Sequence, residues 1–255
     1  MIRAKGGIKR IVLASTVLLT MFAAGVGRAQ QPASPTVPKD AFLGARVPEF
    51  RLHNQTLLDA LWQLARGPAP FGFGFEHVLQ RTLKGPPVPK RLLTLHLEHA
   101  TVRQILDALC RADPRFTWST DGATVDVYPR DVVGDPSYLL NRRIPIFALR
   151  DARRVEDGLF AIPRQLPPPT EQVAVSQVGG SDPYPPTPWN LTLKDVTVRQ
   201  VVNRLAAHGG VCAVWIFGGA EDFRAFGFFN TNLCGKKTPQ WIRKILRSRR
   251  NAGHP

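Results

Sequence analysis

Two closely spaced histidines are the first candidates for chemistry. His96 and His99 lie three residues apart, a spacing that would suit two ligands of one metal ion. They fall across an expected strand end and turn, however, not on one face of a helix. No third ligand is spaced nearby, so we expect solvated histidines and no metal site.

The segment FGFGF at residues 71–75 contains the pattern G-x-G. It lacks the third glycine and the following helix that a dinucleotide fingerprint requires. Strand alternation places its three phenylalanines on one face and its two glycines on the other. We expect a core strand whose glycines allow a helix to approach closely. The alternative is an exposed aromatic platform that serves a small-ligand binder or an enzyme.

Recognised catalytic patterns are missing from the sequence. It contains no G-x-S-x-G, no H-E-x-x-H and no P-loop, and its acidic residues form no telling pair. Several of them lie on expected helices, where solvated roles are the usual ones. The sequence therefore predicts a protein that is not an enzyme and has no catalytic residues and no cofactor.

Three cysteines exclude both a disulfide-dense small protein and a four-cysteine zinc cluster. In an oxidising compartment Cys212 and Cys234 would form a disulfide that closes the last hairpin region, or they remain two free buried thiols. Cys110 ends a helical pattern and is expected to be buried and unbonded.

The segment 236–255 carries seven basic residues and no acidic one. Thr238 and Pro239 are typical of a helix start, which would place Trp241 on an apolar face. Two roles stay open: a solvated tail whose Trp241 packs on the second domain, or a helix that docks on an anionic membrane or an acidic partner. The candidate docking residues are Lys236, Lys237, Trp241, Arg243, Lys244, Arg247, Arg249 and Arg250.

The amino terminus has the three parts of a secretory signal. Basic residues at positions 3–10 precede the apolar stretch Ile11–Val26, and small residues follow up to Ala29. We expect residues 1–29 to be a cleaved signal peptide, followed by a linker over 30–45. The competing interpretation is an uncleaved membrane anchor, although the apolar stretch is short for one. The predicted location is the periplasm or another place outside the cytoplasm.

The charge of the 255-residue chain is concentrated at its ends. Of the net charge of +15, five charges belong to residues 1–29 and seven to residues 236–255. The body therefore carries only +3, and a nucleic-acid partner is not expected. A hydrophobic content of 44% is enough to build a buried core.

The elements that must position these residues come from an internal repeat. Units begin near residues 50, 95, 147 and 191, and the tetrapeptide TVRQ recurs at 101–104 and 197–200. In each unit two apolar residues two positions apart predict a strand, and a helical pattern follows. Thr56, Thr101 and Thr197 are expected to cap three of the helices. The start of the remaining helix, in the unit that begins near residue 147, is less clear and is expected near Asp151 or Arg153.

A second strand is predicted after each helix, near residues 71–76, 116–120, 172–178 and 211–217. The dipeptide Asp121-Gly122 predicts a tight hairpin into a strand over 123–129. We therefore expect an α+β fold with two tandem small domains, each a duplicated β-α-β unit with a closing hairpin strand. Their predicted ranges are 46–130 and, for the second, divergent copy, 138–231.

The chain contains the run FRLHNQTLLDALWQLA, then a predicted strand, then the run LTLHLEHATVRQILDAL and a predicted hairpin. This succession resembles the short N-terminal domain of secretins and TonB-dependent receptors. The match covers residues 48–130 well and 145–230 more loosely, without a pore segment or receptor barrel. The resemblance implies a periplasmic location and a protein-interaction role, with no catalytic residues. We therefore expect a non-catalytic adaptor of the cell envelope that binds another envelope protein by sheet-edge pairing.

Overall fold

The computed structural model describes residues 41–229, except 81, 83, 87, 123, 167–172, 178–187, 209–212 and 221–222. All of these belong to one compact unit, Val37–Pro255. The expected signal peptide, the basic tail, Cys212 and Cys234 lie outside the described residues. No helix in the described part has both the length and the apolar character needed to cross a membrane.

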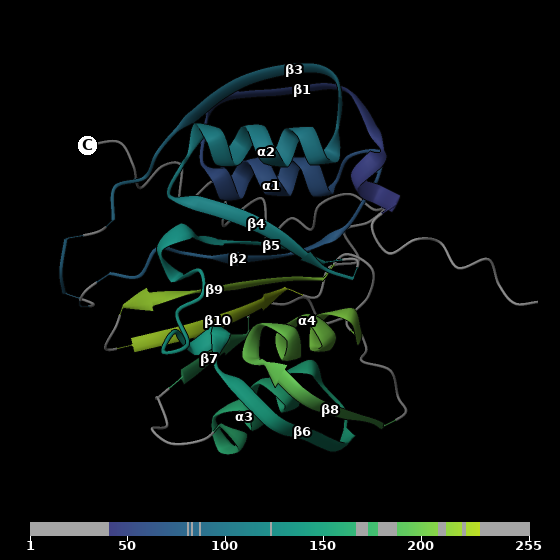
Figure 1. Ribbon diagram of the computed structural model, residues 1–255, viewed down its shortest axis with the longest axis vertical. Coiled ribbons are helices and arrows are strands. Elements are labelled where there is room, and N and C mark those ends of the chain that lie inside the picture. Colours follow the sequence, from purple (N-terminus) through teal and green to yellow (C-terminus); the bar gives the residue numbers. More distant parts are fainter. Residues whose placement is uncertain are drawn as a thin grey trace, which may run out of the picture. The chain divides into compact units, whose positions relative to one another are not determined.

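The chain has an α+β fold in which both halves show the same order of elements (Figure 1). After a 3-10 turn at Ala41–Gly44, the first half comprises β1 (Arg46–Gln55), α1 (Leu57–Ala65), β2 (Gly72–Glu76), β3 (Leu93–Thr101), α2 (Val102–Ala112), β4 (Phe116–Asp121) and β5 (Thr124–Pro129). The second half comprises β6 (Arg143–Ala152), α3 (Val155–Gln165), β7 (Val173–Gln177), β8 (Trp189–Thr197), α4 (Val198–His208), β9 (Val214–Ala220) and β10 (Phe223–Phe229). The short 3-10 turns Arg130–Val132 and Leu139–Asn141 connect the halves.

Threonine side chains start three of the four helices. Thr56 accepts a hydrogen bond from the backbone N–H of Asp59, and Thr101 forms a reciprocal capping box with Gln104. Thr197 makes the same two contacts with Gln200 in α4. These caps satisfy backbone N–H groups that the first helical turn leaves without partners.

The third helix begins differently from the expectation. Its N-cap is Arg154, not Asp151 or Arg153. The Asp157 carboxylate accepts the backbone N–H groups of Arg153 and Arg154, each at 2.9 Å. Asp157 therefore plays the part that Gln104 and Gln200 play in α2 and α4, while the N-cap position holds an arginine in place of a threonine.

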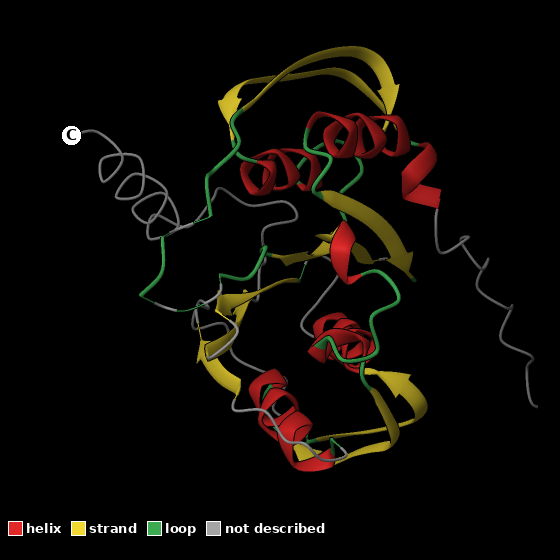
Figure 2. Cartoon of the chain, turned by 60° about the vertical axis from the view of Figure 1, so that its left-hand side comes forward, coloured by secondary structure: helices red, strands yellow, loops and turns green. Residues whose placement is uncertain are grey.

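The strands form three sheets. β1 and β3 form an antiparallel two-stranded ribbon, and so do β6 and β8. Each ribbon lies against the pair of helices of its own half (Figure 2). The remaining strands form one six-stranded sheet in the order β4-β5-β2-β9-β10-β7.

The two halves share this central sheet. Within each half the closing hairpin pairs in the same way, since β5 joins β4 to β2 and β10 joins β9 to β7. Parallel pairing of β2 with β9 then connects the halves. The two ranges expected as tandem domains are therefore joined by main-chain hydrogen bonds within one sheet.

The central sheet has a hydrophobic core on each face. Phe73 and Val127 belong to the core that contains α1 and α2. Trp215 and Phe226 belong to the core that contains α3 and α4. Because side chains alternate along β9, Val214 enters the first core and its neighbour Trp215 the second.

Four residues with left-handed backbone occupy corresponding places in the ribbons. Asn54, His99, Asp151 and Asp195 have φ angles of 50–51°. Each lies four positions after the first apolar residue of its strand–helix unit. Asn, Asp and His adopt this conformation more readily than most residues. The four units thus share a backbone feature as well as an apolar pattern.

Candidate functional site

The phenylalanine strand is part of the core. Phe71, Phe73 and Phe75 are 1%, 0% and 3% exposed, so the alternative of an exposed aromatic platform is wrong. Gly74 does permit a close approach, but its neighbour is the Trp215 ring of β9 and not a helix. A Cβ atom at position 74 would lie 2.1 Å from that ring. Gly74 therefore makes room for the junction between the halves.

A buried ion pair lies at this junction. The Arg199 guanidinium of α4 donates to both carboxylate oxygens of Glu76 at the end of β2, at 2.6 and 3.2 Å. It also donates to Asn141 Oδ1 at 2.7 Å and lies 4.5 Å from the centre of the Tyr128 ring. Glu76 is 0% exposed. The charge of Glu76 is thus neutralised by a residue 123 positions away.

A second buried carboxylate lies beside the pair. Asp126 of β5 is 2% exposed and accepts a hydrogen bond from Asn203 Nδ2 at 2.8 Å. Asn203 in turn accepts the Trp215 indole N–H at 2.7 Å. Burial is the main cause that raises the pKa of Asp126 well above 3.8, and the Glu76 carboxylate adds to the rise. Burial also raises the pKa of Glu76, against the opposing effect of Arg199.

These buried groups connect the two halves and do not form an accessible active site. A general acid or base must come within hydrogen-bonding distance of its substrate. Glu76 and Asp126 are enclosed by the sheet and α4, which leaves no such approach. We interpret the network as a structural junction that fixes the position of α4 on β2 and β5.

Strand alternation alone could not identify this network. Asp126 stands between Val125 and Val127, so the pattern indicates an outward, solvated side chain. The second half of the chain covers that face and buries Asp126 instead. The only signal in the sequence is a carboxylate within an otherwise apolar strand.

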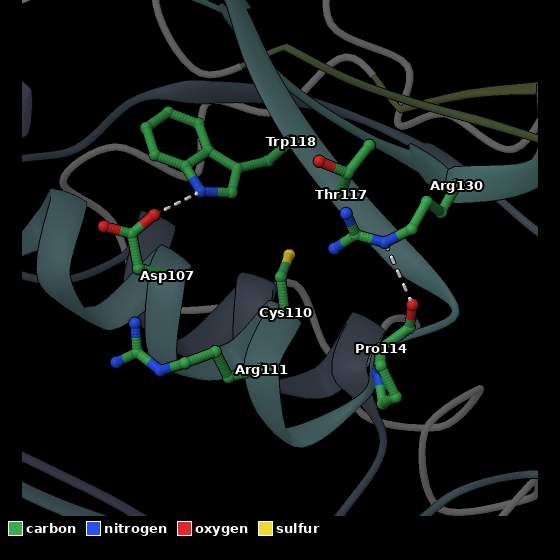
Figure 3. A pocket seen from close by; sticks show the side chains of 7 residues that line it. All are labelled: Asp107, Cys110, Arg111, Pro114, Thr117, Trp118 and Arg130. Atoms are coloured by element: carbon green, nitrogen blue, oxygen red, sulfur yellow. Dashed lines mark hydrogen bonds between the residues drawn. The ribbon is translucent and has the colours of Figure 1, made fainter. Parts of the chain in front are cut away.

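An open hollow lies between α2 and β4 (Figure 3). It has a volume of about 360 Å³, and we call it the β4–α2 pocket. Figure 3 shows that the Cys110 thiol and the Arg130 guanidinium point into it. The lining residues are Asp107, Cys110, Arg111, Pro114, Thr117, Trp118 and Arg130.

Hydrogen bonds fix the walls of the β4–α2 pocket. The Trp118 indole N–H donates to Asp107 Oδ1 at 2.9 Å, and the Arg103 guanidinium lies 5.5 Å from the Trp118 ring centre. Arg130 donates to the backbone oxygens of Pro114 and Phe116, each at 3.2 Å. These contacts hold an indole ring and a cation in place before any ligand binds.

The thiol in the pocket is not an activated nucleophile. Cys110 is buried and unbonded, as expected. Burial raises the pKa of its thiol to about 12, so the thiol stays protonated at neutral pH. The β4–α2 pocket therefore suits binding better than covalent catalysis.

The main chain of β4 is open on the side away from β5. β4 stands at the end of the six-stranded order, so its outer edge has no strand beside it within the described part. Arg130 N–H donates to Arg115 O at the start of the β4–β5 ladder. Since backbone groups alternate along an antiparallel ladder, Trp118 and Thr120 direct theirs to the outer edge.

A cluster on the β1–β3 ribbon departs from the expectation for the histidines. His96 and His99 both lie within β3, not in a turn. Pairing of β1 with β3 brings Glu49 to 3.2 Å from His96 Nε2, and Glu98, two residues after His96 on the same strand, lies 3.4 Å from it. Ligand-type side chains are therefore close to His96, contrary to the expectation, but the cluster of Glu49, His96 and Glu98 does not include His99. All three are exposed, and Glu49 also pairs with Arg51, which makes the cluster a surface ion-pair group.

The proposed disulfide partners, Cys212 and Cys234, and the docking residues from Lys236 to Arg250 lie outside the described residues. None of the protein-family models, curated proteins or solved structures compared with this chain matches it. Functional inference therefore depends on the geometry of the described sites.

Proposed function

We propose that the protein is a non-catalytic, exported adaptor of the cell envelope that binds a partner protein by strand addition. The observation that carries this proposal is the outer edge of β4, where Trp118 and Thr120 direct backbone N–H and C=O groups away from the sheet. Unpaired strand edges recruit extended segments of other chains. The β4–α2 pocket beside the edge would accept a side chain of such a segment.

The proposal also draws on the resemblance of the sequence to the short N-terminal domain of secretins and TonB-dependent receptors. The expected succession of strand, helix, strand, strand, helix and closing hairpin is present over β1 to β5. That domain class implies a periplasmic interaction role. The amino-terminal pattern supports export, and Gln30 would then stand at or near the mature amino terminus.

The proposal is tested by blocking the edge in the full chain. Thr120→Pro blocks the edge because proline lacks the outward backbone N–H that a partner strand would bind, and proline is tolerated on an edge strand. A photo-crosslinking amino acid at position 120 should capture a partner in the envelope, and the same group at the exposed Arg150 of β6 is the control. The proposal fails if position 120 gives no adduct beyond that control.

Amino-terminal sequencing that returns Met1 or Ile2 would contradict export.

A further inference from the structure

The β4–α2 pocket and the outer edge of β4 form one continuous binding surface with a charge preference. We propose that this surface binds an extended segment of a partner protein that carries an acidic side chain, held by Arg130, with Arg111 adding positive charge. The inference rests on the proposed function, since it assumes that strand addition occurs at β4. It adds the chemical class of the segment that is recognised.

The position of Arg130 is the first support. Its Nη2 donates to the outward-directed backbone oxygen of Phe116, at the beginning of the open edge. The guanidinium thereby lies on the same edge of β4 as the outward-directed backbone groups of Trp118 and Thr120. A carboxylate on a segment paired with these two residues would meet Arg130 in the pocket. Guanidinium–carboxylate hydrogen bonds are among the stronger polar contacts in proteins.

The balance of charge around the pocket is the second support. Arg111 is exposed at the rim and Arg103 lies on the face of Trp118. The nearby acid Asp107 already accepts the Trp118 indole N–H. A second nearby acid, Asp113, is paired with Arg115 at 2.7 Å. The arginines therefore outnumber the carboxylates around the pocket, so the field favours an acidic segment and opposes a basic one.

The size of the pocket is the third support. Small-molecule sites usually have volumes of about 300–1,000 Å³. At about 360 Å³ the β4–α2 pocket is at the low end of that range, as expected for one or two side chains. The apolar part of such a side chain would lie against Trp118, and its carboxylate would reach Arg130.

The experiment uses the full chain and a display library of random nine-residue peptides. We expect selected peptides to show at least fivefold enrichment of Asp or Glu at one position. A synthetic peptide from that pool should bind about tenfold more weakly after Glu→Gln replacement, as loss of one charge-assisted bond predicts. Arg130→Gln should cause a similar loss, and Arg111→Gln, which removes an exposed charge, about a threefold loss. Arg150→Gln, far along the chain on β6, should cause none.

The outcomes separate this inference from the proposed function. If peptides bind and Thr120→Pro abolishes binding, but no acidic preference appears, the charge inference is wrong and strand addition at β4 stands. If no peptide binds, or if Thr120→Pro leaves binding unchanged, strand addition at β4 is wrong and the inference falls with it. Acidic enrichment that survives both Arg111→Gln and Arg130→Gln would place recognition elsewhere and overturn the inference.

Discussion

The Arg199 guanidinium of α4 lies 2.6 Å from the Glu76 carboxylate of β2, with the Glu76 side chain fully buried and that of Arg199 14% exposed. These residues belong to different halves of the chain, and α4 contacts β2 where the halves join through the pairing of β2 with β9. A buried carboxylate without a partner would be costly, so the position of α4 and the position of β2 depend on each other. The contact thus joins the two halves through side chains, in addition to the main-chain pairing of the central sheet.

Removal of one partner from this pair should destabilise the protein strongly. Arg199→Ala leaves the Glu76 charge buried and unpaired, and we expect a loss of about 3–5 kcal/mol in the free energy of unfolding. Arg204→Ala on the same helix is the control. Its guanidinium is half exposed and lies 3.8 Å from Asp121, so less than about 1 kcal/mol should be lost. Urea unfolding measures both, and equal losses would contradict the structural role of the pair.

Asp126 should make stability depend on pH. Its pKa is raised in the folded chain, so the folded state keeps a proton that the unfolded chain releases above pH 3.8. The free energy of unfolding should therefore fall as the pH rises from this value through the raised pKa. The asparagine of Asp126→Asn does not ionise, so the free energy of unfolding of this variant should decrease less over the same pH range. Urea unfolding at intervals from pH 4 to pH 8 compares the two proteins.

The neighbours of Asp126 make the comparison necessary. Glu76, whose pKa is also raised, changes stability in the same direction, and Arg199 and Asp121 are the other charged groups near it. All of these remain in the Asp126→Asn variant, so only the difference between the two pH profiles reports on Asp126. Parallel profiles would show that Asp126 does not hold a proton in the folded state.

Helix α2 allows a test of the repeat alignment. Leu61, Leu106 and Val202 are expected at corresponding buried positions, and their exposures are 0%, 1% and 0%. Leu106→Ala should cost about 2–5 kcal/mol as a core truncation. Arg103→Ala on the same helix should cost less than about 1 kcal/mol, since Arg103 is exposed and lies on the face of the Trp118 ring. Similar losses in thermal unfolding would reject the assignment of the buried face.

His99 is a suitable position for a test of the left-handed residues. His99→Gly removes the side chain from a backbone with φ of 50°, where glycine carries little steric penalty, so stability should be unchanged or slightly higher. His99→Val places a β-branched residue there and should cost about 1–2 kcal/mol. Calorimetry of both variants decides, and a more stable valine variant would show that the backbone conformation is not required.

The basic tail should attach the protein to anionic surfaces reversibly. Near an anionic leaflet each Lys or Arg contributes about 1 kcal/mol, screened by salt. The seven basic residues from Lys236 to Arg250 should therefore give binding that is lost at high salt. The test compares the full chain with a chain that ends at Gly235, on vesicles with anionic lipid. Equal binding by both chains would assign the tail a solvated role only.

Local sequence was sufficient for the elements of the fold. Thr101 followed by Gln104 predicts a helix start, because the two side chains satisfy backbone groups only three residues apart. Asp121-Gly122 predicts the β4–β5 hairpin, because Gly122 adopts φ of 65° without steric cost. These interactions are complete within a few residues, so the α+β class could be derived without knowledge of the rest of the chain.

The sites required contacts between distant residues. Asp126 reads as solvated in its own strand and becomes buried only because α4 covers it, and Glu76 finds Arg199 through the β2–β9 pairing. The β4–α2 pocket, by contrast, is formed within residues 107–130, by a helix and the strand that follows it. The alternation of residues along a strand predicts which side chains share a face, but it does not predict which element covers that face. The covering element depends on the order of strands in the sheet. Main-chain pairing between distant segments sets this order, and such pairing does not depend on side-chain identity.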